Sequence, residues 1–292
     1  MGAIDFRFRP VGTQSITRGL TYEYLRKMRL APAPSFERQD IDLMFREMDE
    51  AGIEMGVIGV PAPTDKPGFE STGNQIIAGM VKRYPRRFVG FGSLDAADPA
   101  GALEEIRRVV DLGLVGLTLE PSTARVKRRF DDRAFYPIFE EAQRRALPVL
   151  TVMSCLLGPY MDDCHPELVD HVATDFPGLT LIIQHGAWPY SREACGLAYK
   201  QKNVYLVPGQ YVHYEFPGSE DYVKAANRQL SDQMLFGSVY PNCGPLTEVM
   251  AIVDKLGFAT EEVKHKYLEG NARRLLNLDS AGGPVAGPAR RR

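Results

Sequence analysis

Short apolar runs recur along almost the whole chain, and this recurrence restricts the possible fold more than any other feature. Stretches with helical spacing separate the runs, and strands that alternate with helices are typical of parallel βαβ units. Eight runs predict strands: Ala3–Phe8, Met55–Val60, Phe88–Gly92, Val115–Leu119, Val149–Met153, Leu179–Ile183, Val204–Val207 and Met234–Gly237. Because a TIM barrel has eight parallel strands, we predict an α/β protein with the (β/α)8 barrel fold.

The stretches between the runs predict amphipathic helices. Residues Asp40–Ala51 place Ile41, Phe45 and Met48 on one helical face. Five further stretches have similar spacing: Asn74–Tyr84, Pro99–Leu112, Arg133–Arg145, Pro166–Phe176 and Leu246–Leu256. We expect these apolar faces to pack against the outside of the barrel.

The domain organisation follows from the length and from the even distribution of the pattern. A chain of 292 residues fits one barrel with extensions, and no internal repeat or composition shift divides it. We therefore predict a single domain over residues 1–278. Within it, residues 10–39 form an insert, or lid, after the first strand. The last residues, 279–292, are rich in Ala, Gly, Pro and Arg, and we expect this tail to be disordered.

Charge and cysteine content exclude several classes of protein. The 35 Lys and Arg against 37 Asp and Glu give a net charge of −2, which argues against a nucleic-acid partner. No apolar run approaches the roughly 18 residues of a membrane span, and the charged start of the chain does not resemble a signal peptide. The four cysteines contain no Cys-x-x-Cys pair, which is typical of reduced thiols. We expect a soluble cytoplasmic protein that does not bind membranes.

Candidate functional residues lie where the predicted strands end, because barrel enzymes place their chemistry at the carboxyl ends of the strands. We predict His185, Arg7 and Arg9 as catalytic residues. Imidazole titrates near neutral pH and suits a general acid or base, whereas guanidinium groups match carboxylates and oxyanions. Substrate contacts are predicted for the polar residues at the other strand ends: Glu120, Ser154, Ser238 and Tyr240.

The first strand decides how the two arginines are placed. Since side chains alternate along a strand, Arg7 and Arg9 should both point into the barrel mouth, while Phe6 and Phe8 face the helices. An ion pair between these arginines and Glu120 is the structural alternative to a binding role. The carboxyl group of Glu120 is itself either such a counter-ion or a group for proton transfer.

The insert adds more positive charge near the same end of the barrel. Between Arg18 and Arg38 it has five basic against two acidic residues, a net charge of +3, and two tyrosines, Tyr22 and Tyr24. A basic, aromatic lid would favour a small anionic ligand, whereas a solvated or dimer-forming loop is the alternative.

Five short motifs occur in the order found in one enzyme family: Ile4–Pro10, Arg87–Phe91, Gln184–Pro189, Phe236–Pro241 and Gly270–Leu275. With these motifs the sequence resembles amidohydrolase-related proteins, in the branch that includes aminocarboxymuconate-semialdehyde-type decarboxylases and lactone hydrolases. The resemblance implies a metal-assisted barrel enzyme that acts on C–O, C–N or C–C bonds of small acids.

The sequence departs from the family pattern at the metal ligands. Arg7 and Arg9 occupy the positions of the family's His-x-His, the strand-five histidine falls on Val152, and the strand-eight aspartate falls on Val239. Of these metal-ligand positions, only His185 still carries a residue that could bind a metal. Because guanidinium and valine offer no lone pair to a metal, we predict neither a catalytic metal nor another cofactor.

Three functions stay open at this point. The first is a metal-independent hydrolase of a small carboxylated lactone or ester, and the second is a decarboxylase of a small aromatic or unsaturated acid. The third is a non-catalytic descendant that binds an acidic molecule. A nucleophilic role for Ser238, Cys155 or Cys243, and a metal bound by relocated ligands around His185, are weaker alternatives. We expect a small anionic molecule as the partner and a homodimer as the assembly.

Overall fold

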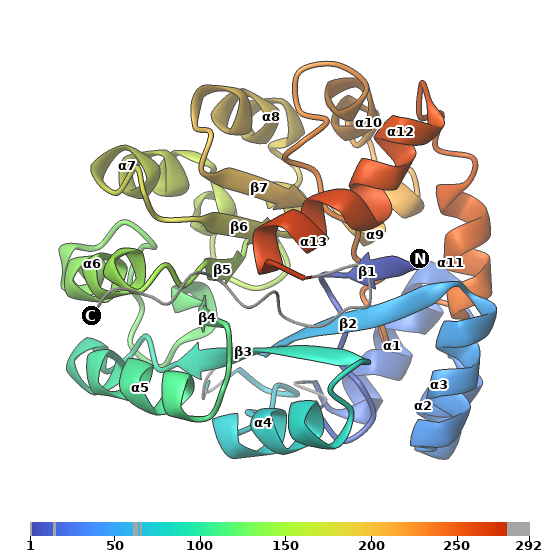
Figure 1. Cartoon of the computed structure of the whole chain (residues 1–292), viewed down its shortest axis with the longest axis horizontal. Coiled ribbons are helices and arrows are strands. Elements are labelled where there is room, and N and C mark those ends of the chain that lie inside the picture. Colours follow the sequence, from blue (N-terminus) through green and yellow to red (C-terminus); the bar gives the residue numbers. More distant parts are fainter. Residues whose placement is uncertain (1, 14–15, 61–63, 65, 279–292) are drawn as a thin grey trace.

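A parallel sheet of seven strands forms the centre of the molecule, within the residues that the computed structural model describes (2–13, 16–60, 64 and 66–278). The strands pair in chain order, and Figure 1 shows them in the middle of the molecule with helices around them. They are β1 (Ala3–Asp5), β2 (Ile53–Gly59), β3 (Phe88–Leu94), β4 (Gly116–Leu119), β5 (Val149–Val152), β6 (Leu181–Gln184) and β7 (Val204–Val207). Seven of the predicted strands are therefore confirmed, and the fold is an α/β, TIM-barrel-like fold.

The eighth predicted strand, Met234–Gly237, is not a regular strand. It forms one isolated parallel bridge, between Met234 and Leu206 of β7. On its other side the Phe6 amide donates to the Phe236 carbonyl at 2.8 Å. The segment thus joins β7 to β1, but the Phe236 amide bonds to the Tyr267 carbonyl instead of to a neighbouring strand. Because this hydrogen bond replaces one to a neighbouring strand, the structure has seven regular strands and not the eight that we predicted.

Helices follow the strands around the sheet, and all six predicted helices are present with ends shifted by a few residues. These six are α3 (Ile41–Glu50), α4 (Asn74–Arg83), α5 (Pro99–Asp111), α6 (Tyr136–Arg144), α7 (Glu167–Asp175) and α11 (Leu246–Val253). Helices that were not predicted are α1 (Arg18–Met28), α2 (Pro34–Arg38), α8 (Ser191–Lys200), α9 (Gln210–His213), α10 (Glu220–Ala226), α12 (Glu261–His265) and α13 (Asn271–Leu276). The insert after β1 therefore contains two helices.

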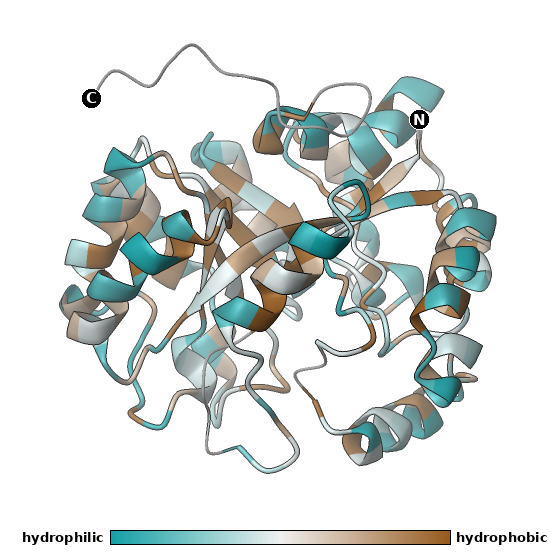
Figure 2. Cartoon of the chain, turned by 60° about the horizontal axis from the view of Figure 1, so that its bottom comes forward, coloured by the Kyte–Doolittle hydropathy of each residue, from teal (hydrophilic) through white to brown (hydrophobic). Residues whose placement is uncertain are grey.

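Two apolar clusters account for the packing. The larger one lies between the sheet and the helices, and in Figure 2 the surrounding helices carry both hydrophobic and hydrophilic residues. The smaller one is formed mainly by inward-facing strand residues such as Met55, Val57, Leu150 and Ile182. Gly116 belongs to this inner side, where a Cβ atom would overlap the ring of Phe91.

The end of β1 departs from simple alternation. Phe8 packs in the outer cluster as predicted, but Phe6 is part of the inner cluster and contacts Phe91 edge to face. The prediction for Phe6 is therefore wrong. The strand ends at Asp5, and the Asp5 carboxylate accepts the amides of Arg7 and Ser238, each at 2.9 Å. The resulting turn interrupts the strand before Arg7, so the side chains no longer alternate between the two sides of the sheet.

The described residues contain no helix long and apolar enough to cross a bilayer. The predicted disordered tail, 279–292, lies outside the described residues.

Candidate active site

A cavity of about 230 Å³ lies at the carboxyl ends of the strands. Five of the seven predicted site residues line it: Arg7, Arg9, Glu120, Ser154 and His185. Tyr24, Lys66, Gln210 and Asn242 add polar groups, and the apolar wall consists of Ile16, Leu20, Pro67, Phe69, Leu156, Leu157 and Val239. The cavity is therefore polar along the strand ends and apolar where the insert and two loops cover it.

The backbone explains how each polar side chain reaches the cavity. Glu120 continues the inward-facing positions of β4, and Ser154 continues those of β5. His185 follows β6 in a left-handed conformation with φ of 65°, and Gly186 and Ala187 have similar φ values. Such a conformation is strained for a residue other than glycine and is concentrated at functional sites.

Arg7 and His185 contact each other directly at the floor of the cavity. Arg7 Nε and Nη2 lie 3.4 and 3.3 Å from His185 Nε2. Both guanidinium nitrogens of Arg7 are donors, so His185 Nε2 must be the acceptor and the ring proton must be on Nδ1. Burial and the charges of Arg7 and Arg9 hold the pKa of His185 well below its usual value, and burial lowers the pKa of Arg7 to about 10. At neutral pH the pair is a cation beside a neutral imidazole.

Arg9 is a buried cation without a protein partner among the described residues. Its exposed fraction is 3%, its Nε atom has no hydrogen-bond partner, and no described carboxylate lies within ion-pair distance of its guanidinium group. Burial lowers the pKa of Arg9 well below its ordinary value, and the charge of Arg7 lowers it further. A buried charge of this kind is costly unless an anion neutralises it.

Glu120 does not form the ion pair that was the alternative for the arginines. Its Oε1 atom accepts the Thr123 hydroxyl at 3.0 Å, whereas Oε2 is buried without a partner in the described residues. Burial raises the pKa of Glu120, against the opposing charges of Arg9 and Arg7. The carboxyl group therefore has one free oxygen at the cavity.

Unpartnered polar atoms are concentrated around this cavity. Buried polar atoms are normally hydrogen-bonded. The lining residues nevertheless contribute five buried atoms without a partner among the described residues: Arg9 Nε, Tyr24 Oη, Glu120 Oε2, His185 Nδ1 and Asn242 Oδ1. This combination of donors and acceptors is suited to a polar ligand with a negative charge.

Two predicted substrate contacts lie elsewhere. Ser238 accepts the Tyr240 amide at 3.0 Å, and the Tyr240 hydroxyl lies 2.8 Å from Ser35 Oγ. Neither side chain lines the cavity. Their segment is irregular, so its register does not follow strand alternation. Ser154 does line the cavity, but its hydroxyl is paired with that of Tyr211 at 2.8 Å.

The insert covers the cavity with apolar and aromatic groups rather than with charge. Ile16, Leu20 and Tyr24 line the cavity, whereas all five basic residues of the insert are exposed and absent from the lining: Arg18, Arg26, Lys27, Arg29 and Arg38. The prediction of a basic lid is wrong, since net charge does not reveal which helix face is turned inward. Lys66, which was not predicted, lines the cavity and donates to the carbonyls of Leu156 and Leu157, each at 2.6 Å.

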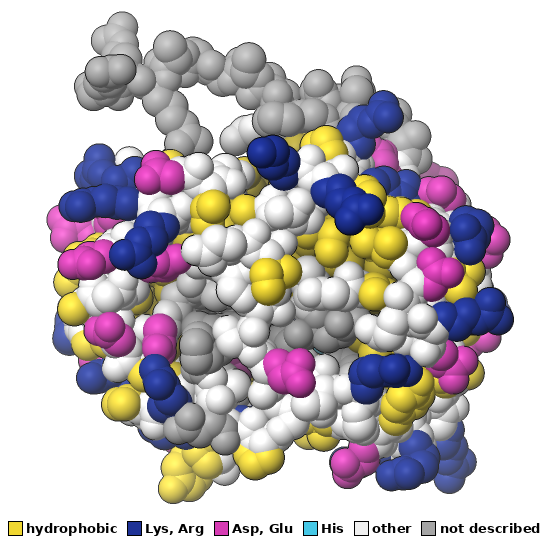
Figure 3. Space-filling model, turned by 90° about the horizontal axis from the view of Figure 1, so that it is seen from below, with side chains coloured by type: hydrophobic (Ala, Val, Ile, Leu, Met, Phe, Trp, Pro, Cys, Tyr) yellow, Lys and Arg dark blue, Asp and Glu magenta, His cyan; other side chains and the backbone are white. Residues whose placement is uncertain are grey.

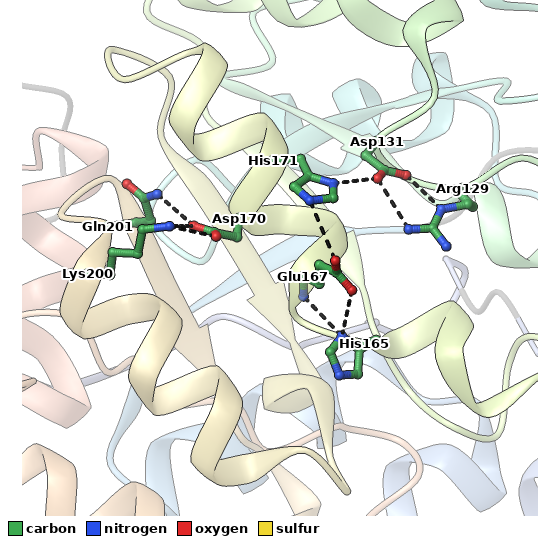
Figure 4. A network of polar contacts seen from close by, with 8 residues as sticks. All are labelled: Arg129, Asp131, His165, Glu167, Asp170, His171, Lys200 and Gln201. Carbon is green, nitrogen blue, oxygen red and sulfur yellow. Dashed lines mark hydrogen bonds and ion pairs between the residues drawn. The ribbon is translucent and has the colours of Figure 1, made fainter.

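The remaining histidines lie outside the cavity. His165 and His171 belong to a network with Glu167, Asp131 and Arg129, shown in Figure 4, in which His171 Nδ1 lies 2.7 Å from Asp131. His213 lies in α9 and is buried, and burial lowers its pKa to about 3.

The donor set does not fit a metal of the kind that the family resemblance implies. The described residues include no group of three or more His, Cys, Asp or Glu side chains that could hold a metal ion. Arg7 and Arg9 have only donors, Val239 has no ligand atom, and the Nε2 lone pair of His185 is already directed at Arg7. Cys243 does not line the cavity, and burial raises the pKa of its thiol, as it does for Cys155.

Figure 3 shows Lys and Arg side chains interspersed with Asp and Glu on the face seen from below. Neither sign of charge dominates this face. The cavity residues Arg7 and Arg9 are buried and therefore contribute almost nothing to the exposed surface.

Comparison with known proteins identifies the family. The amidohydrolase family model matches residues 26–278, which is most of the chain. The chain belongs to the amidohydrolase family. The match begins after Arg7 and Arg9, so the departure at the first strand lies outside the matched region.

Individual relatives agree with this assignment. The chain superimposes on an uncharacterized TIM-barrel protein from Bordetella bronchiseptica with a TM-score of 0.89 and 35% identity, over 94% of this chain and 98% of the other. It is 29% identical to 2-amino-3-carboxymuconate-6-semialdehyde decarboxylase of Dictyostelium discoideum over 36% of this chain and 31% of that protein. It is 36% identical to gamma-resorcylate decarboxylase of Rhodococcus jostii over 26% of each. The matched part thus spans about a third or less of these curated relatives.

Proposed function

We propose that this amidohydrolase-family protein is a metal-independent decarboxylase of a small aromatic or unsaturated acid. The observation that carries the proposal is the pair of buried guanidinium groups, Arg7 and Arg9, which line the cavity without a carboxylate in ion-pair contact among the described residues. The similarity to two decarboxylases supports the choice of reaction.

The arrangement separates the two ends of an acidic substrate. An oxygen conjugated with the scissile bond binds to Arg7 and Arg9, and the leaving carboxylate lies against apolar side chains such as Leu157 and Phe69. A carboxylate loses hydration there, which raises its energy relative to neutral carbon dioxide. As the C–C bond breaks, the electron pair moves toward the oxygen that the guanidinium groups stabilise. The two cations thus supply positive charge at the positions that the family resemblance assigns to metal ligands.

Hydrolysis of a lactone or ester is the second candidate. It is favoured by the free Oε2 atom of Glu120, which could activate water, and by the arginines, which could stabilise an oxyanion. It requires a competent base, however. The Nε2 atom of His185 already accepts from Arg7. Burial raises the pKa of Glu120 against the opposing charges of Arg9 and Arg7, and so favours its protonated form, which cannot take a proton from water. Decarboxylation needs no activated water and is therefore the better fit to this cavity.

The proposal is tested by incubating the protein with a panel of aromatic and unsaturated acids and lactones. Release of carbon dioxide is measured together with ring opening. We expect carbon dioxide in equal amount to the acid consumed. Arg9→Met should lower turnover at least a hundred-fold, whereas Arg26→Met, the same change at an exposed position of the insert, should not. Ring opening without carbon dioxide would support the hydrolase, and saturable binding of an acid without turnover would support the non-catalytic descendant.

A further inference from the structure

The decarboxylation proposed above leaves one requirement unassigned, namely the proton that replaces the carboxyl group. The bond that breaks leaves its electron pair on the substrate, and carbon must then receive a proton from a group at the cavity. Among the lining residues, His185, Glu120, Tyr24 and Lys66 carry a hydrogen that could be transferred. Their contacts distinguish between them.

His185 is prevented from acting as an acid by its contact with Arg7. A cationic imidazole would need a proton on Nε2, which faces the Nε and Nη2 donors of Arg7 at 3.4 and 3.3 Å. Two donors facing each other repel, and the guanidinium charge adds to this repulsion. His185 therefore stays neutral, with its Nδ1–H group available as a hydrogen-bond donor.

Lys66 and Tyr24 are less suitable. The Lys66 ammonium group donates to the carbonyls of Leu156 and Leu157 and lies 5.0 Å from the ring centroid of Phe69. These contacts hold it at the wall of the cavity. Burial raises the pKa of the Tyr24 hydroxyl, so this group binds its proton more tightly than an ordinary phenol does.

Glu120 lines the cavity and has one carboxyl oxygen, Oε2, without a hydrogen-bond partner among the described residues. Its side chain is 5% exposed, and the Thr123 hydroxyl fixes Oε1 at 3.0 Å, so the second oxygen has a defined place at the cavity. No described residue bonds to Oε2, and neither arginine lies within ion-pair distance of the carboxyl group. In the protonated form this oxygen can present its hydrogen to a ligand.

We propose that Glu120 is the proton donor of this site and that His185 is a neutral hydrogen-bond donor that orients the substrate. This inference rests on the proposed decarboxylase function. The proton on Oε2 moves to the carbon atom that lost carbon dioxide, and the new Glu120 carboxylate is stabilised by Arg9 and Arg7. One proton from solvent restores the carboxyl group after the product leaves, so the reaction consumes one carboxylate anion and one proton and yields one product and one carbon dioxide.

The charged and titratable groups around Glu120 agree with a carboxyl group that can hold a proton. Burial raises its pKa, while Arg9, Arg7 and Lys66 and the hydrogen bond from Thr123 act in the opposite direction. Binding of an anionic substrate between Arg7 and Arg9 neutralises part of the opposing positive charge. The substrate itself therefore favours the protonated form of Glu120.

Infrared spectroscopy tests the protonation state without any substrate. On lowering the pH, we expect the carbonyl band of a protonated carboxyl group to appear in the wild-type protein at a higher pH than for an ordinary glutamate, and to be absent from Glu120→Gln. Thr123→Val should keep the band but move it, because this variant removes the hydrogen bond to Oε1. A wild-type spectrum that lacks the band both alone and with a bound acid would overturn the proposal.

Kinetics tests the role in proton transfer separately. Glu120→Gln should bind the acid but release carbon dioxide about 10²–10⁴ times more slowly, the usual contribution of a general acid. His185→Asn retains an N–H donor near the position of Nδ1 and should lose only about ten-fold. If His185→Asn loses as much as Glu120→Gln, the assignment of the proton is wrong. Absence of carbon dioxide from every acid with the wild type would instead refute the decarboxylase function.

Discussion

The arginines at the two ends of the barrel differ in their partners. At the amino ends of the strands, Arg273 of α13 bonds to Glu269 and to Glu54 of β2, each at 2.6 Å. At the carboxyl ends, Arg7 and Arg9 have no carboxylate in ion-pair contact among the described residues. Carboxylate hydrogen bonds raise the pKa of Arg273, whereas burial lowers the pKa of both Arg7 and Arg9.

The difference shows what each end does. A cation with two carboxylate partners contributes to stability, because its neighbours compensate for the lost hydration. A cation without them reduces stability until a ligand supplies the missing negative charge. Under our proposal, the amino end of the barrel is therefore the stabilising end and the carboxyl end is the binding end, as in barrel enzymes generally.

The largest expected effect is the loss of function when the unpaired cations are removed. Arg7→Met combined with Arg9→Met should lower kcat/KM about a thousand-fold, which is about 4 kcal/mol. The free energy of unfolding should stay within about 1 kcal/mol of the wild type or increase, because a buried unpaired charge is replaced by an apolar side chain. Carbon dioxide release and urea unfolding measure the two quantities. A large loss of stability would show that the arginines are structural.

The reverse pattern is expected at the other end. Arg273→Met should lower the free energy of unfolding by about 3 kcal/mol, because it leaves the carboxylates of Glu269 and Glu54 without their cation. Turnover of the folded protein should remain within about two-fold, because Arg273 does not line the cavity. Urea unfolding and the same assay measure these effects. If Arg273→Met were as stable as the wild type, Arg273 would not stabilise the fold, and the proposed difference between Arg273 and the pair Arg7 and Arg9 would be wrong.

A smaller effect concerns Asp5, which connects β1 to the segment that follows β7. Burial raises the pKa of Asp5 to about 6, so its proton stabilises the folded state, and this stability is lost as the pH rises through about 6. Asp5→Asn cannot ionise but keeps a side-chain oxygen for the amides of Arg7 and Ser238. Relative to the variant, the wild type should lose about 1 kcal/mol between pH 5 and pH 7. Urea unfolding at both pH values measures this difference, and a difference that does not change with pH would contradict it.

Much of the fold was predictable because strands and helices leave local patterns. The β-branched runs identify β1 to β7, and helical spacing identifies six helices. The eighth segment, Met234–Gly237, was mispredicted as a regular strand because its Phe236 amide bonds to the Tyr267 carbonyl instead of to a neighbouring strand. Helices of the insert were missed because their apolar faces are short.

The site was predictable only where it follows the strands. The rule that barrel chemistry lies at the carboxyl ends of strands identifies Arg7, Arg9, Glu120, Ser154 and His185. Tyr24 was predicted only as part of an aromatic lid. Lys66 and Asn242 were missed, since loop packing brings them to the cavity and their sequence neighbourhood carries no signal for it. Which polar atoms remain unpartnered is also a property of the three-dimensional structure alone.

The central claim is that the two guanidinium groups, rather than a metal ion, supply the positive charge of the site. The most direct test measures the metal content of the untagged protein by inductively coupled plasma mass spectrometry, together with acid turnover before and after chelation. We expect well below one equivalent of metal per protein chain, and turnover that chelation does not change. Near-stoichiometric zinc, iron or manganese, with turnover lost on chelation and restored by the metal, would contradict it.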